Sequence, residues 1–357
     1  MIGLYVHIPF CRAKCPYCDF YSLPCKTELA EQYTAAVISR LAADSHCFDT
    51  VYFGGGTPNL LGAERLVRIL SAIRSRIAPQ AEITTELNPT EVDFPFFSTL
   101  REGGFNRISI GLQSANADEL QILGRKHSTD DVFCAVQSAK AAGFTNISLD
   151  LMLGVPGASE KKLKASIDFC MDVGLTHLSC YLLKIEEQTP FFHMKDLLAL
   201  PTEDETCDLY LSLVREMTAR GFSQYEISNF SLPGFESRHN LKYWDCQEYL
   251  GIGPAAHSFL EGKRFYYPRD LSYFLSGGEP IFDSDGGSFS EYAMLRLRLT
   301  EGLLREECIK RYSAENFHQI CKKAEFLPPH LVNLSAHCLS FTPEGFLVSN
   351  TLLATLL

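Results

Sequence analysis

Short β-rich runs alternate with longer amphipathic segments over the first half of this chain. Runs that favour strands lie at 4–8, 50–53, 82–87, 107–112, 147–152 and 177–183. Segments that favour helices lie between them, at 28–43, 63–77, 130–142 and 160–173. The last two stop at Gly143 and Gly174, where a helix C-cap is expected. This alternation predicts a parallel sheet with right-handed crossovers. Six repeats are too few to close the usual eight-stranded barrel, so we expect an open, partial (β/α)6 barrel, with a flat doubly wound sheet as the alternative.

The pattern changes after residue 183 of the 357 residues. We expect a helix at 203–220, a strand at 223–227 and a polar, aromatic loop at 238–249. From residue 288 the order helix, helix, short helix and two strand-like runs, near 339–341 and 346–348, resembles a small winged-helix module. The predicted α/β fold therefore has three parts, which are a barrel over 1–185, an extension over 186–287 and a winged-helix-like end over 288–357.

The composition favours a cytoplasmic protein with no membrane anchor. Hydrophobic residues make up 46% and charged residues 21% of the chain, and no apolar run reaches the roughly 18 residues that a membrane span needs. A net charge of −11 without a basic block argues against a nucleic-acid partner. Thirteen cysteines with no export signal favour thiols that are reduced or bound to metal. The composition is compatible with a monomer or a homodimer.

Three cysteines follow the first predicted strand within the run CRAKCPYC at 11–18. Cys11, Cys15 and Cys18 can ligate three irons of a [4Fe-4S] cluster and leave the fourth iron open to a small molecule. A vacant coordination site is typical of metals that do chemistry. The alternatives are a zinc site, with His7 or Asp19 as the fourth ligand, and cysteines that are simply buried.

Polar or flexible residues also lie at the ends of the second, third and fourth predicted strands and within the fifth. The run GGGTP at 54–58 allows a close backbone approach, and we expect its N–H groups to point inward toward a ligand. Glu86, Gln113 and Asp150 each interrupt an apolar strand, where a buried polar group needs a ligand or a protein partner. Arg125 can pair with a carboxylate. An ordinary tight turn, structural hydrogen bonds and a surface cation are the simpler readings of these features.

The CxxxCxxC spacing is the signature of the radical S-adenosylmethionine superfamily. Within it, the chain resembles the HemN/HemW family through YVHIPFC at 5–11, GGGTP at 54–58, SIGLQ at 109–113, DLMLGVP at 150–156 and LSFTPEGFLVSN at 339–350. The resemblance covers nearly the whole chain. It implies that the amino-acid end of S-adenosylmethionine chelates the open iron. It also implies contacts to this cofactor from Tyr5, Tyr17, Gly55, Gly56, Thr57, Glu86, Gln113, Arg125 and Asp150.

That family contains oxygen-independent coproporphyrinogen III oxidases and related heme chaperones. The oxidases resemble CxxxCxxCxC, whereas this chain has Phe20 at the place of the extra cysteine. They also carry a long extension ahead of the cluster, whereas the first cysteine here is residue 11. Both differences favour the chaperone branch.

The run HNLKYW at 239–244 matches the HNxxYW motif of the chaperone-like members. A histidine nitrogen can ligate heme iron, and Tyr243 and Trp244 can pack on the macrocycle. The resemblance therefore implies that His239 handles heme, with His257 as a second candidate and a structural histidine as the simpler reading. We expect a carrier that binds heme and passes it to an acceptor apoprotein. The alternatives are decarboxylation of porphyrinogen propionates and a cluster protein in which S-adenosylmethionine has only a structural or regulatory role.

Overall fold

One curved sheet organises most of the molecule in the computed structural model, which describes residues 1–357. Its twelve strands run in the order β12-β11-β10-β9-β1-β2-β3-β4-β5-β6-β8-β7. The first six are parallel neighbours in chain order: β1 (Ile2–Ile8), β2 (Phe48–Gly55), β3 (Ile77–Leu87), β4 (Arg107–Gln113), β5 (Asn146–Leu153) and β6 (His177–Leu182). A doubly wound sheet reverses its strand order at a switch point. This sheet does not, and its outermost strands do not pair, so the predicted open barrel is confirmed.

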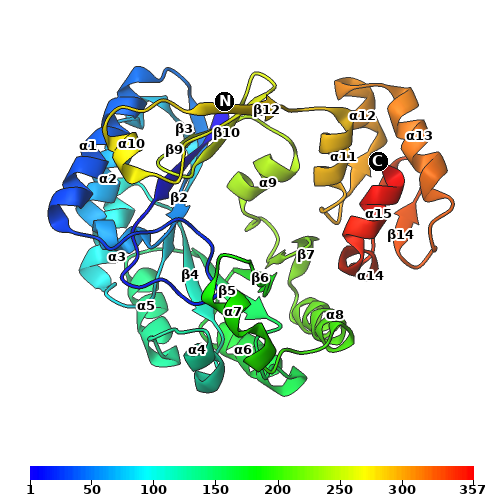
Figure 1. Ribbon diagram of the computed structural model, residues 1–357, viewed down its shortest axis with the longest axis horizontal. Coiled ribbons are helices and arrows are strands. Elements are labelled where there is room, and N and C mark those ends of the chain that lie inside the picture. The colour runs from blue at the N-terminus through cyan, green and yellow to red at the C-terminus, as the bar shows by residue number, and fades with distance from the viewer.

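Helices cover the convex side of this sheet (Figure 1). They are α1 (Thr27–Ala43), α2 (Ala63–Ser71), α3 (Phe94–Gly103), α4 (Ala117–Ile122), α5 (Thr129–Ala141) and α6 (Glu160–Asp172). Ser128 and Ser159 cap the starts of α5 and α6 by accepting backbone N–H bonds. Gly143 and Gly174 follow the ends of these helices with φ of 90° and 67°, as the sequence predicted. Short 3₁₀ helices lie at Pro58–Leu61, Arg74–Arg76 and Lys195–Leu197.

The two faces of the parallel strands differ in polarity. Alternate residues such as Val51, Phe53 and Ile108 are fully buried under the helices. The residues between them face the concave side and are largely polar. They include Thr50, Tyr52, Thr84, Glu86, Arg107, Ser109, Ser148, Asp150, His177 and Ser179. The interior of the barrel is therefore lined by polar side chains, which can bind polar groups.

The segment after β6 extends both edges of the same sheet. Helices α7 (Pro190–Met194) and α8 (Glu203–Ala219) precede β7 (Ser223–Glu226) and β8 (Asn229–Ser231), and β8 pairs with β6. The chain then crosses through α9 (Arg238–Trp244) to β9 (Tyr249–Ile252), which is parallel to β1. The far edge is completed by β10 (His257–Leu260), β11 (Lys263–Tyr266), α10 (Leu271–Leu275) and β12 (Ile281–Asp285). Strands from both sides of residue 185 thus share one sheet, and the three-part domain division stays a prediction.

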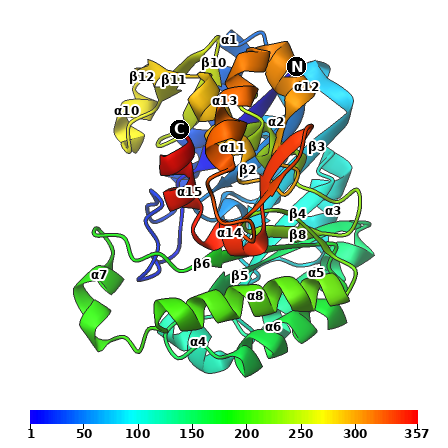
Figure 2. The same ribbon diagram turned by 90° about the vertical axis from the view of Figure 1, so that its right-hand side faces the viewer.

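The last 70 residues form a separate small sheet with helices, seen beside the barrel in Figure 1 and in front of it in Figure 2. The order is α11 (Phe289–Arg296), β13 (Leu303–Leu304), α12 (Arg305–Arg311), α13 (Ala314–Ala324), β14 (Val332–Leu334) and β15 (Cys338–Phe341), followed by α14 (Pro343–Leu347) and α15 (Ser349–Leu356). The strand order β13-β15-β14 suits the expected winged-helix-like end.

One expected strand in this region is wrong. Residues 346–348 lie largely in α14, because Thr342 accepts the N–H of Gly345 and Pro343 occupies the first turn. These two local signals for a helix start outweigh the apolar run FLV. No helix anywhere in the structure is long and apolar enough to cross a membrane.

The packing of the convex face gives a stability prediction. Phe53 is fully buried, and its ring centroid lies 5.2 Å from that of Phe105. We expect Phe53→Ala to lower the free energy of unfolding by about 3–5 kcal/mol in a urea titration, because the substitution leaves a cavity. Phe133→Ala is the control, since Phe133 is 48% exposed on α5. An equal loss in both variants would contradict the assigned packing.

Candidate functional site

The three thiols of the CxxxCxxC run lie on one loop at the carboxyl end of β1. The N–H of Cys11 donates to the carbonyl of Leu23 at 2.9 Å, and the N–H of Leu23 donates to Pro9 at 2.8 Å. The N–H of Cys18 donates to the carbonyl of Cys15 at 3.1 Å. These bonds close the loop on itself and hold all three cysteines at the mouth of the barrel.

The surroundings of the thiols fit a cluster with three protein ligands. Burial raises the pKa of the Cys18 thiol, and the nearby Cys15 and Cys11 add to the rise. The charge of Lys14 acts in the opposite direction and lowers the pKa of Cys18, and a cation favours the thiolate form that binds iron. No three His, Cys, Asp or Glu side chains meet around a single ion position. A cubane cluster takes each cysteinate on a different iron, so its ligands need no common point.

The two side chains that could complete a zinc site are engaged elsewhere. His7 is buried, with Nδ1 2.9 Å from the Tyr5 hydroxyl and Nε2 3.1 Å from the carbonyl of Tyr21. The Asp19 carboxylate pairs with Arg269 at 3.1 Å. Neither side chain is free to add a fourth ligand to the three thiols.

The glycine turn after β2 packs directly on the cysteine loop. Gly56 donates its N–H to Ile8 at 2.9 Å and Thr57 donates to Phe10 at 2.7 Å. A Cβ on Gly56 would lie 2.6 Å from the carbonyl oxygen of Phe10, so no larger residue fits. The Thr57 hydroxyl lies 3.2 Å from the Cys11 sulfur. The turn therefore fixes the position of Cys11.

The expectation that the N–H groups of this turn point at a ligand is wrong. The N–H of Gly56 donates to Ile8 at the end of β1, that of Thr57 donates to Phe10 just before Cys11, and that of Gly55 donates to the Glu86 carboxylate at 3.0 Å. Gly55 has a φ of 102°, and a Cβ there would collide with the His7 ring at 2.4 Å. All three N–H donors are used within the protein. The turn and Glu86 therefore offer carbonyl and carboxylate oxygens, which accept hydrogen bonds. Acceptors suit an ammonium group.

Glu86 closes β3 and links this turn to the tyrosines of the inner face. Its carboxylate accepts from the Tyr52 hydroxyl at 2.8 Å. Burial, and to a lesser extent the neighbouring Asp150, raise the pKa of Glu86 to about 7. Tyr5 lies beside this group, with its ring centroid 6.2 Å from that of Tyr52. The sequence reasoning missed Tyr52, whose signal was an aromatic residue two positions before the glycine run.

Gln113 and Asp150 lie on the next two strands, as the sequence predicted. Gln113 ends β4 and is buried, with a φ of 67° that is rare for a residue with a side chain. Strained backbone of this kind is commonly found at ligand sites. Asp150 accepts from the Ser109 hydroxyl at 2.9 Å, and burial raises its pKa. Both side chains therefore stand at the same end of the sheet as Glu86.

Arg125 is not a surface cation. It follows α4, and its Nε and Nη2 donate to the Tyr17 hydroxyl at 3.0 and 2.6 Å. Tyr17 belongs to the cysteine loop, and its ring centroid is 6.2 Å from that of Phe191 on α7. Phe191 also donates its N–H to Pro16 at 3.0 Å. Sequence reasoning missed Phe191, because nothing in its local pattern shows that α7 returns to this loop.

His239 lies on a helix inside the barrel rather than in the expected loop. Helix α9 forms because the Ser237 side chain caps it and the Glu82 carboxylate accepts the N–H groups of Arg238 and His239 at 3.1 and 3.0 Å. Figure 1 shows α9 within the curve of the sheet. Glu82 lies 157 positions before His239, so no local sequence pattern could reveal this cap.

Both ring nitrogens of His239 are occupied. Nδ1 lies 2.9 Å from the Thr50 hydroxyl and Nε2 lies 2.7 Å from the Tyr243 hydroxyl, while the ring stacks on Tyr52 at 5.2 Å. Heme ligation needs a free nitrogen lone pair, so one of these bonds would have to break. A heme role for His239 stays a prediction. His257, the second candidate, is exposed at the start of β10 and stacks on Tyr266 at 5.7 Å.

The burial of His239 predicts a pH dependence of stability. Desolvation lowers its pKa to about 3, whereas an unfolded histidine titrates near 6.5. The folded imidazole therefore stays neutral while the unfolded one gains a proton, so stability present above pH 6.5 is lost as the pH falls from 6.5 toward 3. His239→Gln should reduce this slope by up to about 1.4 kcal/mol per pH unit, measured by urea unfolding between pH 7.5 and 5. The exposed His193→Gln control should keep the wild-type slope. An unchanged slope in His239→Gln would contradict the buried, neutral state.

Comparisons with known proteins agree with this geometry. Residues 5–170 match the model of the radical SAM superfamily. The heme chaperone HemW of Lactococcus lactis is 33% identical over 97% of this chain and 94% of its own length. The heme chaperone HemW of Bacillus subtilis is 32% identical over 98% of this chain and 97% of its own.

Among solved structures, the coproporphyrinogen III oxidase HemN of Escherichia coli superposes with a TM-score of 0.83 at 20% identity, over 99% of this chain and 89% of its own. This likeness confirms the fold. The whole-length matches decide the branch: the chain belongs to the HemW heme chaperone family of the radical SAM superfamily.

Proposed function

We propose that this protein is a heme chaperone, which binds heme and transfers it to an acceptor apoprotein. The observation that carries the proposal is the similarity to HemW heme chaperones over 97–98% of the chain. Phe20 supports it, because this exposed aromatic stands where oxidases of the family have a further cysteine. With thirteen free thiols, we place the protein in the cytoplasm.

Cys11, Cys15 and Cys18 would hold a [4Fe-4S] cluster, and the open iron would bind S-adenosylmethionine. When bound, the cluster supplies an electron donor and a Lewis-acidic iron. The acceptors at the mouth, Glu86 and the glycine turn, suit the ammonium group of the cofactor. Asp150 and Gln113 add a carboxylate and an amide for its ribose or carboxylate groups. The Tyr17 ring, held by Arg125, offers an apolar face for the adenine.

The ligand assignment predicts which cysteines matter. Cys11→Ser, Cys15→Ser and Cys18→Ser should each abolish or strongly reduce cluster assembly after anaerobic reconstitution, because only two thiolates remain. The measurement is iron and sulfide content, with about four of each expected per wild-type chain. Cys25→Ser is the matched control, since Cys25 lies on the same loop and is half-buried. Its thiol donates to the carbonyl oxygen of Leu60 at 3.6 Å. A cluster that survives loss of Cys15 but not of Cys25 would contradict the assignment.

Heme binding and oxidase activity separate the proposal from its alternative. The reconstituted protein should bind one heme per chain, seen as a saturable Soret shift. It should form no vinyl product from coproporphyrinogen III, S-adenosylmethionine and a reductant. Robust protoporphyrinogen formation without tight heme binding would overturn the chaperone and favour the oxidase. The same titration at different protein concentrations, followed by light scattering, reports whether heme drives a homodimer.

A further inference from the structure

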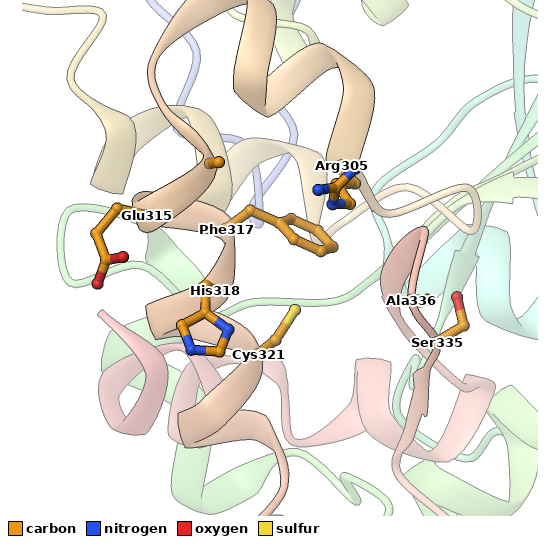
Figure 3. Close-up of a pocket in the computed structure, with 8 residues that line it drawn as sticks. Arg305, Glu315, Phe317, His318, Cys321, Ser335 and Ala336 are labelled. Atoms are coloured by element: carbon orange, nitrogen blue, oxygen red, sulfur yellow. The ribbon is translucent and has the colours of Figure 1, made fainter.

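A cavity of about 380 Å³ lies between α13 and the turn that joins β14 to β15 (Figure 3). It offers little apolar surface to a ligand, because its only large apolar side chain, Phe317, is 5% exposed and packs in the main core. The other lining residues are small, polar or charged. An exposed aromatic residue with exposed charges around it lies instead on the cysteine loop.

The aromatic residue of this surface is Phe20. It follows Cys18 by two positions and is 63% exposed. A single exposed apolar side chain is ordinary on a protein surface. The charged groups that gather around Phe20 from distant parts of the chain distinguish it from such a residue.

Three cations from separate segments surround Asp19, the residue before the exposed ring. They are Lys14 of the cysteine loop, Lys184 after β6 and Arg269 after β11. The Arg269 guanidinium pairs with the Asp19 carboxylate at 3.1 Å and lowers its pKa, and the charges of Lys14 and Lys184 add to this effect. Lys184 also pairs with Glu186 at 2.6 Å. The fold therefore brings three cations together beside the thiols.

The cations are the more exposed partners of these ion pairs. The Arg269 side chain is 54% exposed and that of Asp19 is 35% exposed. The Lys184 side chain is 80% exposed and that of Glu186 is 40% exposed. Lys14 is exposed as well. The outermost charges around the aromatic ring are thus positive, on a chain whose net charge is −11.

The place of this surface indicates what docks on it. The inference rests on the proposed cluster, because a cluster that gives up an electron has to be reduced again. Electron transfer between proteins falls off steeply with distance, so the donor has to dock over the cysteine loop.

We propose that Phe20, Lys14, Lys184 and Arg269 form a donor-docking surface, which binds a small acidic protein that carries one electron. One electron leaves the reduced carrier, which is oxidised, and enters the oxidised cluster, which is reduced. No bond and no proton is exchanged.

The arrangement of the donor-docking surface suits a short-lived encounter. An apolar centre with a polar rim is the usual anatomy of a protein interface. Electron-transfer partners bury little area on each other, so one aromatic ring with three cations is a sufficient core. Opposite charges on the two partners steer them together and raise the rate of association.

The test is stopped-flow reduction of the full-length reconstituted chain by a reduced flavodoxin and, separately, by a reduced ferredoxin. Both probes are acidic proteins that carry one electron. The second-order rate constant of cluster bleaching is the measurement. Dithionite needs no docking surface, so its reaction shows whether each variant holds a reducible cluster.

Three variants change the donor-docking surface. Lys14→Glu and Lys184→Glu should each slow reduction by the carriers about three- to tenfold at low salt, and this loss should shrink as salt rises. Phe20→Ala should slow it by a similar factor that depends little on salt, because the contact of the ring is apolar. Lys322→Glu is the matched control, since Lys322 is exposed on α13 of the C-terminal module. Arg269 is left unchanged, because its ion pair holds the cysteine loop.

Slower reduction by a carrier in the three variants, with wild-type rates in Lys322→Glu and with dithionite, supports the surface. Unchanged carrier rates in the three variants overturn it, as does a wild-type cluster that dithionite reduces and neither carrier reduces. Variants that lose heme binding but keep their carrier rates also overturn it and leave the chaperone function standing. A wild-type chain that assembles no cluster removes the proposed cofactor, and the donor-docking surface with it.

Discussion

The two-residue period of the parallel strands determines how this molecule is built. Every second side chain is apolar and packs under the outer helices, as Phe53 and Ile108 do. The residues between them are polar and line the concave side. A parallel sheet in an α/β protein usually has two apolar faces, and a buried polar group without a partner is costly. Polar groups must therefore pair with the side chains of the interior, and these groups differ between the amino and carboxyl ends of the strands.

At the amino ends of the strands the chain supplies its own partners. Glu82 caps α9, Thr50 bonds His239, and Ser148 lies 2.8 Å from His177. The HNxxYW run therefore packs inside the barrel and bonds to side chains of its inner face. At the carboxyl ends burial raises the pKa values of Glu86 and Asp150, although the charge of Arg107 acts to lower both. A charged ligand would gain the most binding free energy at this end of the barrel, and the three thiols lie at the same end. The amino ends of the strands thus hold residues with partners in the chain, and the carboxyl ends hold the residues that we propose bind the cofactor.

Much of this arrangement could be predicted from local sequence. Strand and helix alternation gave the sheet order, and polar residues at strand ends identified Glu86, Gln113 and Asp150. The failures share a physical cause, which is a partner that is distant in sequence. The N–H groups of the glycine turn were expected to face a ligand, but those of Gly56 and Thr57 donate to Ile8 and Phe10, which lie far earlier in the chain. Helix α9 was expected as a loop because its cap comes from Glu82. The strand expected near residue 346 failed for a local reason, since Thr342 and Pro343 start a helix there.

Iron-edge anomalous diffraction from crystals of the reconstituted protein with S-adenosylmethionine and heme tests the account most directly. The account predicts a four-iron cluster on Cys11, Cys15 and Cys18, with the cofactor against Glu86 in the barrel mouth. It predicts the heme iron as a separate peak outside that mouth. A porphyrin stacked in the mouth beside S-adenosylmethionine would contradict the carrier function, because that is where a substrate for the radical chemistry would lie.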